Sequence, residues 1–236
     1  MLPFEPVCGE CQDGKWFRTD YPVEHPDFGK LIPCSWCNTV TAEQRLRRSG
    51  LTAKEQRQTL DAFDPNRDPA KRAELTKNLA TARAYAEGRL RTPFLVLQGS
   101  KGTGKSHLAA GITLDRIYHP EHGPSGRFWY VIDMLDTLRA SMGDEDKRYE
   151  LLIEGISTMP FLVLDDLGQQ SDTAWANERV KQIVNARYRK ELSTVITTNK
   201  NLLAAFDEAL ASRIFAENEG FTTVLTFTAK DQRLKP

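Results

Sequence analysis

The stretch Phe94-Leu-Val-Leu-Gln-Gly-Ser-Lys-Gly-Thr-Gly-Lys-Ser106 decides how this chain of 236 residues folds. Its first part is a short continuous apolar run, as in a strand buried on both faces of a parallel sheet. Its second part, residues 99–106, fits the pattern G-x-x-x-x-G-K-[ST] and leads into a helical pattern over residues 105–118. A glycine-rich turn between a buried strand and a helix indicates a phosphate-binding loop.

This loop contains the groups that bind the phosphates of a nucleotide. Its backbone N–H groups would surround the phosphates at the positive end of the following helix. Lys105 would reach the β- and γ-phosphates, and Ser106 would bind Mg²⁺, so the expected cofactors are ATP and Mg²⁺. We expect His107 to pack at the start of the helix but include it in the set. The predicted nucleotide-binding residues are Gly99, Ser100, Lys101, Gly102, Thr103, Gly104, Lys105, Ser106 and His107.

Two further apolar runs end in polar side chains. Residues 161–164 precede Asp165, a predicted Mg²⁺ ligand, and Asp166, which would polarise the attacking water. Asp166 could instead be a plain helix cap, and it is one methylene shorter than the glutamate usual in many such ATPases, so we expect slow hydrolysis. Asn199 follows the apolar run 193–197 and is a candidate sensor of the γ-phosphate, because strand ends of a parallel sheet face the nucleotide. Thr-Asn can equally be a turn.

The remaining pattern is that of an α/β protein, a parallel sheet flanked by helices. Helices are expected over residues 105–118 and 174–190, and they separate several of the apolar runs. Strands are expected at residues 94–98, 127–131, 161–164, 193–197 and 224–227. Upstream, we expect helices over residues 41–48 and 52–63 and a third beginning at Pro69 with Asp68 as its N-cap. The predicted domains are residues 1–48, 49–91 and 92–236.

Four cysteines form two C-x-x-C pairs, Cys8 with Cys11 and Cys34 with Cys37. This spacing lets two thiolates bind one tetrahedral ion, and four sulfur ligands close a structural zinc site. The intervening residues have little apolar core, so Zn²⁺ would supply the stability that packing cannot. Two disulfides or a redox pair are the alternatives, and the proline-rich context lacks the βαβ unit of a redox motif.

Composition narrows the remaining classes of function. The 32 basic and 32 acidic residues balance, so any contact with nucleic acid must come from local patches. Arg187, Arg189 and Lys190 form one basic cluster, for which a solvated helix face is the favoured reading over phosphate contact. No stretch approaches the roughly 18 apolar residues that span a bilayer, and the N-terminus lacks the features of a signal peptide. We therefore expect no membrane contact and a place in the cytosol.

Arg213 ends the segment Leu210-Ala-Ser-Arg213 in a helical stretch far from the phosphate loop. An arginine there could stabilise the charge of the transition state in a neighbouring subunit, an effect worth roughly 10³–10⁵ in rate where it has been measured. A surface salt bridge is the alternative reading. If the first reading holds, the catalytic residues are Asp166, Asn199 and Arg213.

The order of the motifs resembles bacterial and phage replicative helicase loaders of the DnaC/DnaI type, with the transposition ATPase IstB as a relative. The resemblance covers roughly residues 51–233. It is carried by Gly102-Thr-Gly-Lys-Ser-His-Leu-Ala109, Leu164-Asp-Asp-Leu-Gly168, Asn185-Ala-Arg-Tyr188, Thr197-Thr-Asn199 and Ala211-Ser-Arg213.

The resemblance implies an AAA+ core that assembles into a ring or spiral, binds single-stranded DNA and acts on a hexameric replicative helicase. It matches Arg213 to the arginine finger and the N-terminal zinc module to the part that contacts the helicase. Arg233 lies near the family's terminal Ser-Tyr-Arg, but this chain has Lys230-Asp-Gln-Arg233, so the departure leaves a sensor role for Arg233 in doubt.

Three other functions fit parts of the pattern. An IstB-like regulator of DNA transposition shares the ATPase motifs but usually lacks the zinc clips. A nucleotide kinase can carry zinc, although its cysteines interrupt the catalytic core, whereas these precede it. A non-hydrolysing ATP-gated adaptor would keep the nucleotide site and lose turnover.

The cysteine pattern predicts about one zinc ion per chain, because four thiolates complete one tetrahedral shell. Cys34→Ser should unfold the N-terminal module and leave ATP binding nearly intact. Metal analysis of freshly reduced protein checks the first expectation, and circular dichroism with a nucleotide-binding assay checks the second. Reduced protein without zinc would contradict the assignment.

Overall fold

The computed structural model describes residues 16–18, 22, 24, 28, 31–33, 41–142, 148–169, 173–199 and 220–231. The chain forms two compact units, Met1–Gln44 and Arg45–Pro236. The predicted zinc ligands Cys8, Cys11, Cys34 and Cys37 lie outside the described residues, as do Arg213 and Arg233. The segments of the predicted connector, residues 49–91, belong to the same unit as the sheet described below.

The first unit contains a short antiparallel pair of strands, β1 (Trp16–Arg18) and β2 (Leu31–Pro33). Phe17 pairs with Ile32 at the centre of the register. In the sequence this pair of strands falls between the two C-x-x-C clips.

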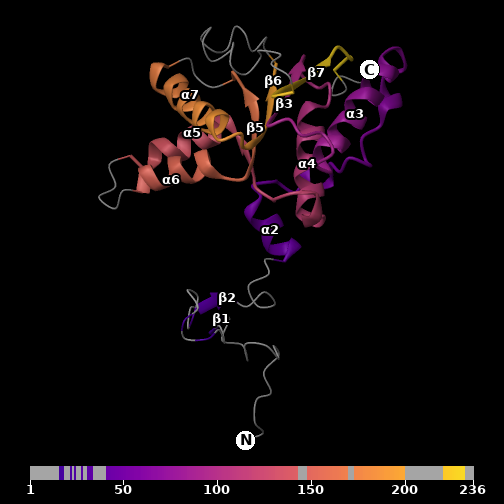
Figure 1. The fold of residues 1–236 in the computed structure, drawn as a ribbon. Helices are drawn as coiled ribbons and strands as arrows, with labels where there is room; N and C mark the ends of the chain where they lie inside the picture. The colour runs from indigo at the N-terminus through magenta and orange to yellow at the C-terminus, as the bar shows by residue number, and fades with distance from the viewer. Residues whose placement is uncertain are drawn as a thin grey trace, which may run out of the picture. The chain divides into compact units, whose positions relative to one another are not determined.

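The second unit is built on a five-stranded parallel sheet with the order β4-β5-β6-β3-β7 (Figure 1). This confirms the predicted α/β class. The strands are β3 (Phe94–Gly99), β4 (Arg127–Tyr130), β5 (Phe161–Leu167), β6 (Ser193–Thr198) and β7 (Thr222–Phe227). Strand β6 lies between the strand of the phosphate loop and β5, so the ends of all three strands meet at one edge.

Helices cover both faces of the sheet (Figure 1). On one side lie α3 (Arg72–Ala86) and α4 (Lys105–Tyr118), and on the other lie α5 (Val131–Ala140), α6 (Arg148–Thr158) and α7 (Ala174–Arg189). Side chains of a strand alternate between the two faces. Accordingly Phe94 and Val96 of β3 pack into the core under α5, α6 and α7. All of the first four residues of β3 are fully buried, which explains their continuous apolar run.

The two helices α5 and α6 were not predicted. The strand expected at residues 127–131 ends at Tyr130, because Val131 already begins α5. Val131, Met134, Leu135 and Leu138 follow at helical spacing and are buried against the sheet. Both helices are short, at 10 and 11 residues, so their periodicity covers too few turns to stand out in the sequence.

The prediction of a helix over residues 52–63 was wrong. Only one 3-10 turn forms, η1 (Glu55–Arg57), where the Glu55 carboxylate accepts a bond from Thr52 N at 2.9 Å. Beyond it the chain follows the surface of α4. Leu60 lies over Gly111, where an added Cβ would come within 2.7 Å of the Leu60 side chain. Contacts with α4 therefore override the local helical preference.

The helix expected from Pro69 begins later, at Arg72. Two 3-10 turns precede it, η2 (Pro65–Arg67) and η3 (Pro69–Lys71). Asp68 is the N-cap residue of η3 but its side chain does not bond to that turn. It accepts instead from Lys230 N at 3.0 Å, which ties the connector to the segment after β7. The expected helix over residues 41–48 is present as α2 (Ala42–Arg48).

Arg187 is fully buried, so the prediction that it lies on a solvated helix face was wrong. Its guanidinium donates to the backbone oxygens of Ile156 (3.2 Å), Met159 (2.7 Å) and Ser193 (2.8 Å) and to the Thr194 hydroxyl (2.9 Å). Burial lowers the pKa of Arg187 to about 10, which leaves it charged at neutral pH. One side chain thus joins the end of α6, α7 and the start of β6.

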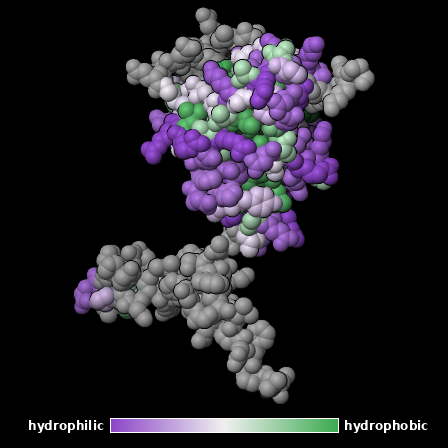
Figure 2. Space-filling view, turned by 90° about the vertical axis from the view of Figure 1, so that its right-hand side faces the viewer, coloured by the Kyte–Doolittle hydropathy of each residue, from purple (hydrophilic) through white to green (hydrophobic). Residues whose placement is uncertain are grey.

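The surface of this unit is mostly polar where it can be seen. Figure 2 shows mostly hydrophilic residues on this face of the unit, with apolar patches near its middle. Large exposed apolar side chains in the described part of this unit come from separate segments: Tyr118, Ile132, Met142, Leu151 and Val224. No helix in the described ranges is both long and apolar enough to cross a membrane.

Replacement of Arg187 by methionine should lower the free energy of unfolding by on the order of 3 kcal/mol, because buried carbonyl oxygens lose their donors. In a chain of this size that corresponds to a fall in melting temperature of about 6–12 °C. Arg189→Met, two residues along the same helix and exposed, should change stability by less than about 0.5 kcal/mol. Urea unfolding of both variants checks this, and equal losses would contradict the role of Arg187.

Candidate nucleotide-binding site

The loop between β3 and α4 has a backbone that requires glycine at two positions. Gly102 and Gly104 have φ values of 71° and 98°, in the left-handed region that other residues avoid. Space is also limiting, since a Cβ at Gly102 would collide with the Asp231 carboxylate and one at Gly104 with the Arg67 guanidinium. The loop is thereby held in the curved form that lets backbone N–H groups converge on an anion.

Lys105 is the first residue of α4, and its side chain turns back under the loop. It is 4% exposed, and its ammonium donates to the backbone oxygens of Gly99 (2.9 Å) and Ser100 (2.6 Å). The Thr103 hydroxyl closes the same turn by donating to Ser100 O at 2.9 Å. The cation therefore sits at the base of the loop, beside the place where phosphate oxygens would compete for it.

Asp165 lies near the end of β5 and is 1% exposed. Its Oδ1 accepts a bond of 2.6 Å from the Thr197 hydroxyl of β6. Its Oδ2 is buried without a regular hydrogen-bond partner, although the Ser106 hydroxyl is near enough to lower the pKa of the carboxyl. Burial, opposed by Thr197 and reinforced by the charge of Asp166, raises that pKa to about 6. An unpaired carboxylate oxygen beside a serine hydroxyl fits Mg²⁺, which prefers oxygen ligands.

Asp166 occupies a bulge in β5. Leu164 pairs with Ile196 and Leu167 with Thr198, so β5 contains one more residue than β6 between these pairs. Asp166 adopts a left-handed conformation with φ of 57°, and its N–H donates to the Thr197 hydroxyl at 2.9 Å. The bulge turns its carboxylate toward Asn199, whose amide donates to Asp166 Oδ1 at 3.3 Å.

Lys105, Asp166 and Asn199 line one cavity of about 280 Å³ at the edge of the sheet, whereas the buried Asp165 is not among the residues that line it. Sequence reasoning placed eight of the lining residues at the site, and six of these come from the loop and the following helix: Lys101, Gly102, Gly104, Lys105, Ser106 and His107. Asp166 and Asn199 come from the ends of β5 and β6, as expected. Four others were missed: Lys54, Gln58, Arg67 and Gln169.

Arg67 is the most informative of the missed residues. It belongs to η2, in the predicted connector, and its guanidinium donates to the backbone oxygen of Thr103 in the loop. It also stacks over the Phe63 ring, with its central carbon 4.1 Å from the ring centroid. Burial lowers its pKa, while Asp64 and Asp68 oppose that shift. The only signal in the sequence was an arginine in a turn, which does not indicate a contact with a loop 36 residues away.

His107 packs at the start of α4, as expected, and lines the cavity as well. Its ring lies edge-on to Phe63 at 5.3 Å, and its Nε2 is 2.9 Å from Thr59 O. Burial lowers its pKa, which favours the neutral ring. The helix therefore holds the connector against the nucleotide loop through this side chain.

The charges around the cavity are complementary to those of a polyanion that carries a bound cation. Lys54, Arg67, Lys101 and Lys105 supply positive charge, and Asp165 and Asp166 supply negative charge at the strand ends. A nucleoside triphosphate with Mg²⁺ presents the complementary arrangement. The structure does not test a contribution from Arg213, which lies outside the described residues.

Comparison with known proteins gives a consistent picture. The family model for the IstB-like ATP binding protein matches residues 35–218. The replicative helicase loader DnaC of Escherichia coli K12 is 28% identical over 127 residues, which is 52% of this chain and 50% of that protein. The replicative helicase loader DnaI of Bacillus subtilis is 29% identical over 106 residues, 44% of this chain and 32% of that protein. The chain thus matches half the length of these curated relatives or less.

Solved structures agree on the fold. The crystal structure of the DnaC helicase loader aligns with 75% of this chain and 99% of its own, at 26% identity and a TM-score of 0.61. The crystal structure of DnaI covers 76% of this chain and 96% of its own, at 23% identity and a TM-score of 0.56. The replication initiator DnaA bound to AMPPCP and single-stranded DNA is 20% identical, covers 74% of this chain and 50% of its own, and has a TM-score of 0.53. The sheet and its helices are those of the AAA+ fold.

Lys105→Ala should abolish tight binding of ATP, because the phosphates lose the cation at the base of the loop. Lys77→Ala removes an exposed lysine from α3 and should leave binding unchanged. Titration with a fluorescent ATP analogue measures both. Unaltered affinity in Lys105→Ala would show that the phosphates bind elsewhere.

Proposed function

This chain belongs to the family of IstB-like ATP binding proteins, and from that premise we propose that it is an ATP-dependent loader of a replicative DNA helicase. It would place a hexameric helicase on single-stranded DNA during the initiation of replication, in the cytosol of a bacterium or a phage-infected cell. The observation that carries the ATPase part is the convergence of Lys105, Asp166 and Asn199 on one cavity. The two kinds of curated relative, both replicative helicase loaders, support the choice of task.

The site residues predicted from the sequence each have a proposed role in hydrolysis. The loop and Lys105 bind the phosphates, and Ser106 and Asp165 hold Mg²⁺, which supplies charge neutralisation when bound. Asp166 accepts a proton from, or polarises, the attacking water, and Asn199 orients that water. The hydrogen bond between Asn199 and Asp166 supports this pairing, because it sets the direction of the carboxylate before substrate arrives.

Thr197 has a proposed positioning role. Its hydroxyl donates to Asp165 and accepts from the Asp166 backbone N–H, so it fixes the metal ligand relative to the water-activating residue. Hydrolysis is expected to be slow, since aspartate at position 166 reaches one methylene less far than glutamate.

The site is proposed to be completed by a second subunit. Arg213 matches an arginine finger by sequence resemblance, and such a residue stabilises charge that develops during phosphoryl transfer. Assembly into a ring or spiral would bring one subunit's Arg213 to its neighbour's phosphates.

The N-terminal module is proposed to bind Zn²⁺ through Cys8, Cys11, Cys34 and Cys37 and to dock on the helicase. The division of the chain into two compact units supports a recognition element distinct from the ATPase. The alternative, an IstB-like regulator of DNA transposition, is favoured by the name of the matching family model. A non-hydrolysing adaptor is the other alternative, and single-turnover ATPase measurements distinguish it.

Deletion of residues 1–48 should remove binding to the replicative helicase and spare ATP binding, if the N-terminal module is the docking element. The Lys105→Ala full-length chain serves as the converse control, with helicase docking retained and nucleotide binding lost. Pull-down with purified helicase and an ATP-analogue titration give the two readouts. Helicase affinity retained by the deleted chain would refute the docking role, and capture of a transposase in place of helicase would favour the alternative function.

Mixing two inactive variants tests whether Arg213 acts on a neighbour. Arg213→Ala should bind ATP and hydrolyse it poorly, whereas Lys105→Ala has an empty pocket and an intact arginine. A mixture should recover part of the ATPase activity, because some interfaces then pair a functional pocket with a functional arginine. The measurement is ATP turnover across a titration of one variant into the other, with single-stranded DNA or helicase present to promote assembly. Activity that stays at background throughout would place Arg213 in its own subunit or outside the reaction.

A further inference from the structure

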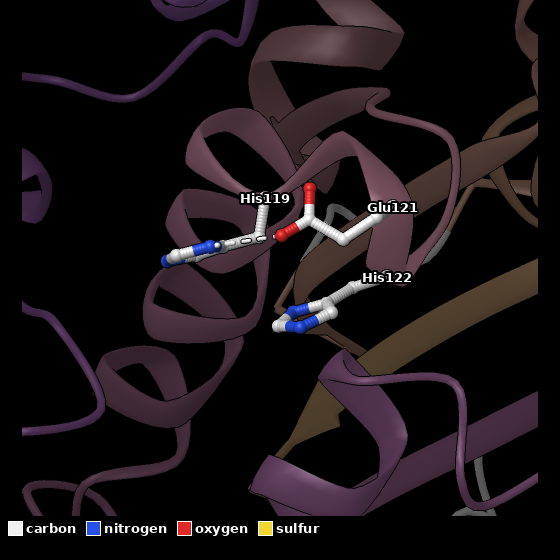
Figure 3. A group of neighbouring side chains, drawn as sticks. All are labelled: His119, Glu121 and His122. Carbon is white, nitrogen blue, oxygen red and sulfur yellow. Dashed lines mark hydrogen bonds and ion pairs between the residues drawn. The ribbon is translucent and has the colours of Figure 1, made fainter.

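A group of side chains with the chemistry of metal ligands lies at the end of α4 opposite the glycine-rich loop. His119, Glu121 and His122 fall within four residues, and one ligand atom from each lies within 4.8 Å of the others. Figure 3 shows the three side chains converging from one turn, with the Glu121 carboxylate extending toward the His119 ring. Neither the family resemblance nor the proposed function uses this group.

The backbone holds these side chains together. Helix α4 ends at Tyr118, and the 3-10 turn η4 (Pro120–His122) follows at once. His119 N donates to Asp115 O at 2.8 Å and His122 N donates to His119 O at 3.0 Å, so the helix and the turn are continuous. The turn also packs against the end of α3, where a Cβ at Gly88 would lie 3.0 Å from His122 O.

One of the three ligand separations already matches that of a zinc site. Zn–N bonds of about 2.0–2.1 Å in a tetrahedron place neighbouring ligand atoms roughly 3.3–3.4 Å apart. His119 Nδ1 and Glu121 Oε1 are already 3.3 Å apart. The His122 ring stacks beside that of His119, with centroids 5.0 Å apart. The side chains of His119 and Glu121 are 53% and 64% exposed, so rotation about their own bonds can close the remaining gap.

Asp115 gives the cluster its supporting hydrogen bond. Its carboxylate, on α4, lies 2.7 Å from His122 Nδ1 and is only 19% exposed. A carboxylate that accepts from one ring nitrogen of a histidine leaves the lone pair of Nε2 free for a metal and increases its basicity.

We propose that His119, Glu121 and His122 bind a divalent transition-metal ion, with Zn²⁺ as the preferred ion. Two imidazoles and one carboxylate are ligands that zinc accepts, and the fourth position stays open to water. The ion would join the end of α4 to η4. The competing explanation is that the histidines form only surface hydrogen bonds with Glu121 and Asp115.

The test is a zinc titration of the full chain, in buffer without nucleotide or Mg²⁺. The protein is first exposed to zinc and then passed over a chelating resin, so that only tightly held metal remains. Isothermal titration with Zn²⁺ should then reveal one further equivalent. His119→Gln and His122→Gln should each weaken that equivalent more than tenfold, and Asp115→Asn should weaken it about 10- to 100-fold through the supporting hydrogen bond.

Glu150→Gln on α6 is the matched control for Glu121→Gln, since both remove an exposed carboxylate. Glu121→Gln should weaken the further equivalent, and Glu150→Gln should not. Long-range ¹H–¹⁵N spectra of the unaltered protein give a readout that does not depend on how the variants fold. One equivalent of Zn²⁺ should shift the ring nitrogens of His119 and His122 and leave His107 unchanged. Ring signals of His119 and His122 that do not move, or zinc affinity unaffected by both histidine variants, would overturn the proposal.

Discussion

Burial of parallel strands on both faces is the constraint on which the rest of this structure depends. Strand β3 lies between β6 and β7, with helices on either side, so the interior of the sheet accepts few polar groups. Functional polar side chains must therefore lie where the strands end. The glycine-rich loop after β3, Asp166 at the end of β5 and Asn199 after β6 all meet there. The candidate site is thus a consequence of how the core is covered.

That constraint also explains which parts of the molecule could be read from the sequence. The sequence predicted the strand and loop at residues 94–106, because apolar runs and glycine spacing are local signals. It also predicted both ends of helix α4 correctly. Asp165, Asp166 and Asn199 followed from their place after apolar runs. The bulge that turns Asp166 was not predictable, because it depends on the pairing of β5 with β6 and on the Thr197 hydroxyl. Arg67 and Lys54 were missed because they reach the site by tertiary packing of the connector.

The predicted connector, residues 49–91, contributes Lys54, Gln58 and Arg67 to the lining of the candidate cavity. The segment that leads from the N-terminal unit to the sheet contacts the phosphate loop at Thr103 through Arg67. It also follows α4 through Leu60 and His107. Any shift of the loop on binding phosphates would alter contacts made by the connector, which enters the ATPase unit from the N-terminal side. The glycine-rich loop and that segment are therefore in direct contact.

Arg187 imposes a restriction on how this sequence can diverge. Its fork of donors satisfies acceptors in α6, in the turn after α6 and in β6, and lysine offers a single point of charge that cannot span the same geometry. Arginine could be exchanged without loss only together with a rebuilt turn after α6 and a new start to β6. A substitution at position 187 therefore requires further substitutions at residues distant in the chain if stability is to be kept. The amino acids that can be accepted in the turn after α6 and at the start of β6 are thus limited by one arginine outside the candidate site.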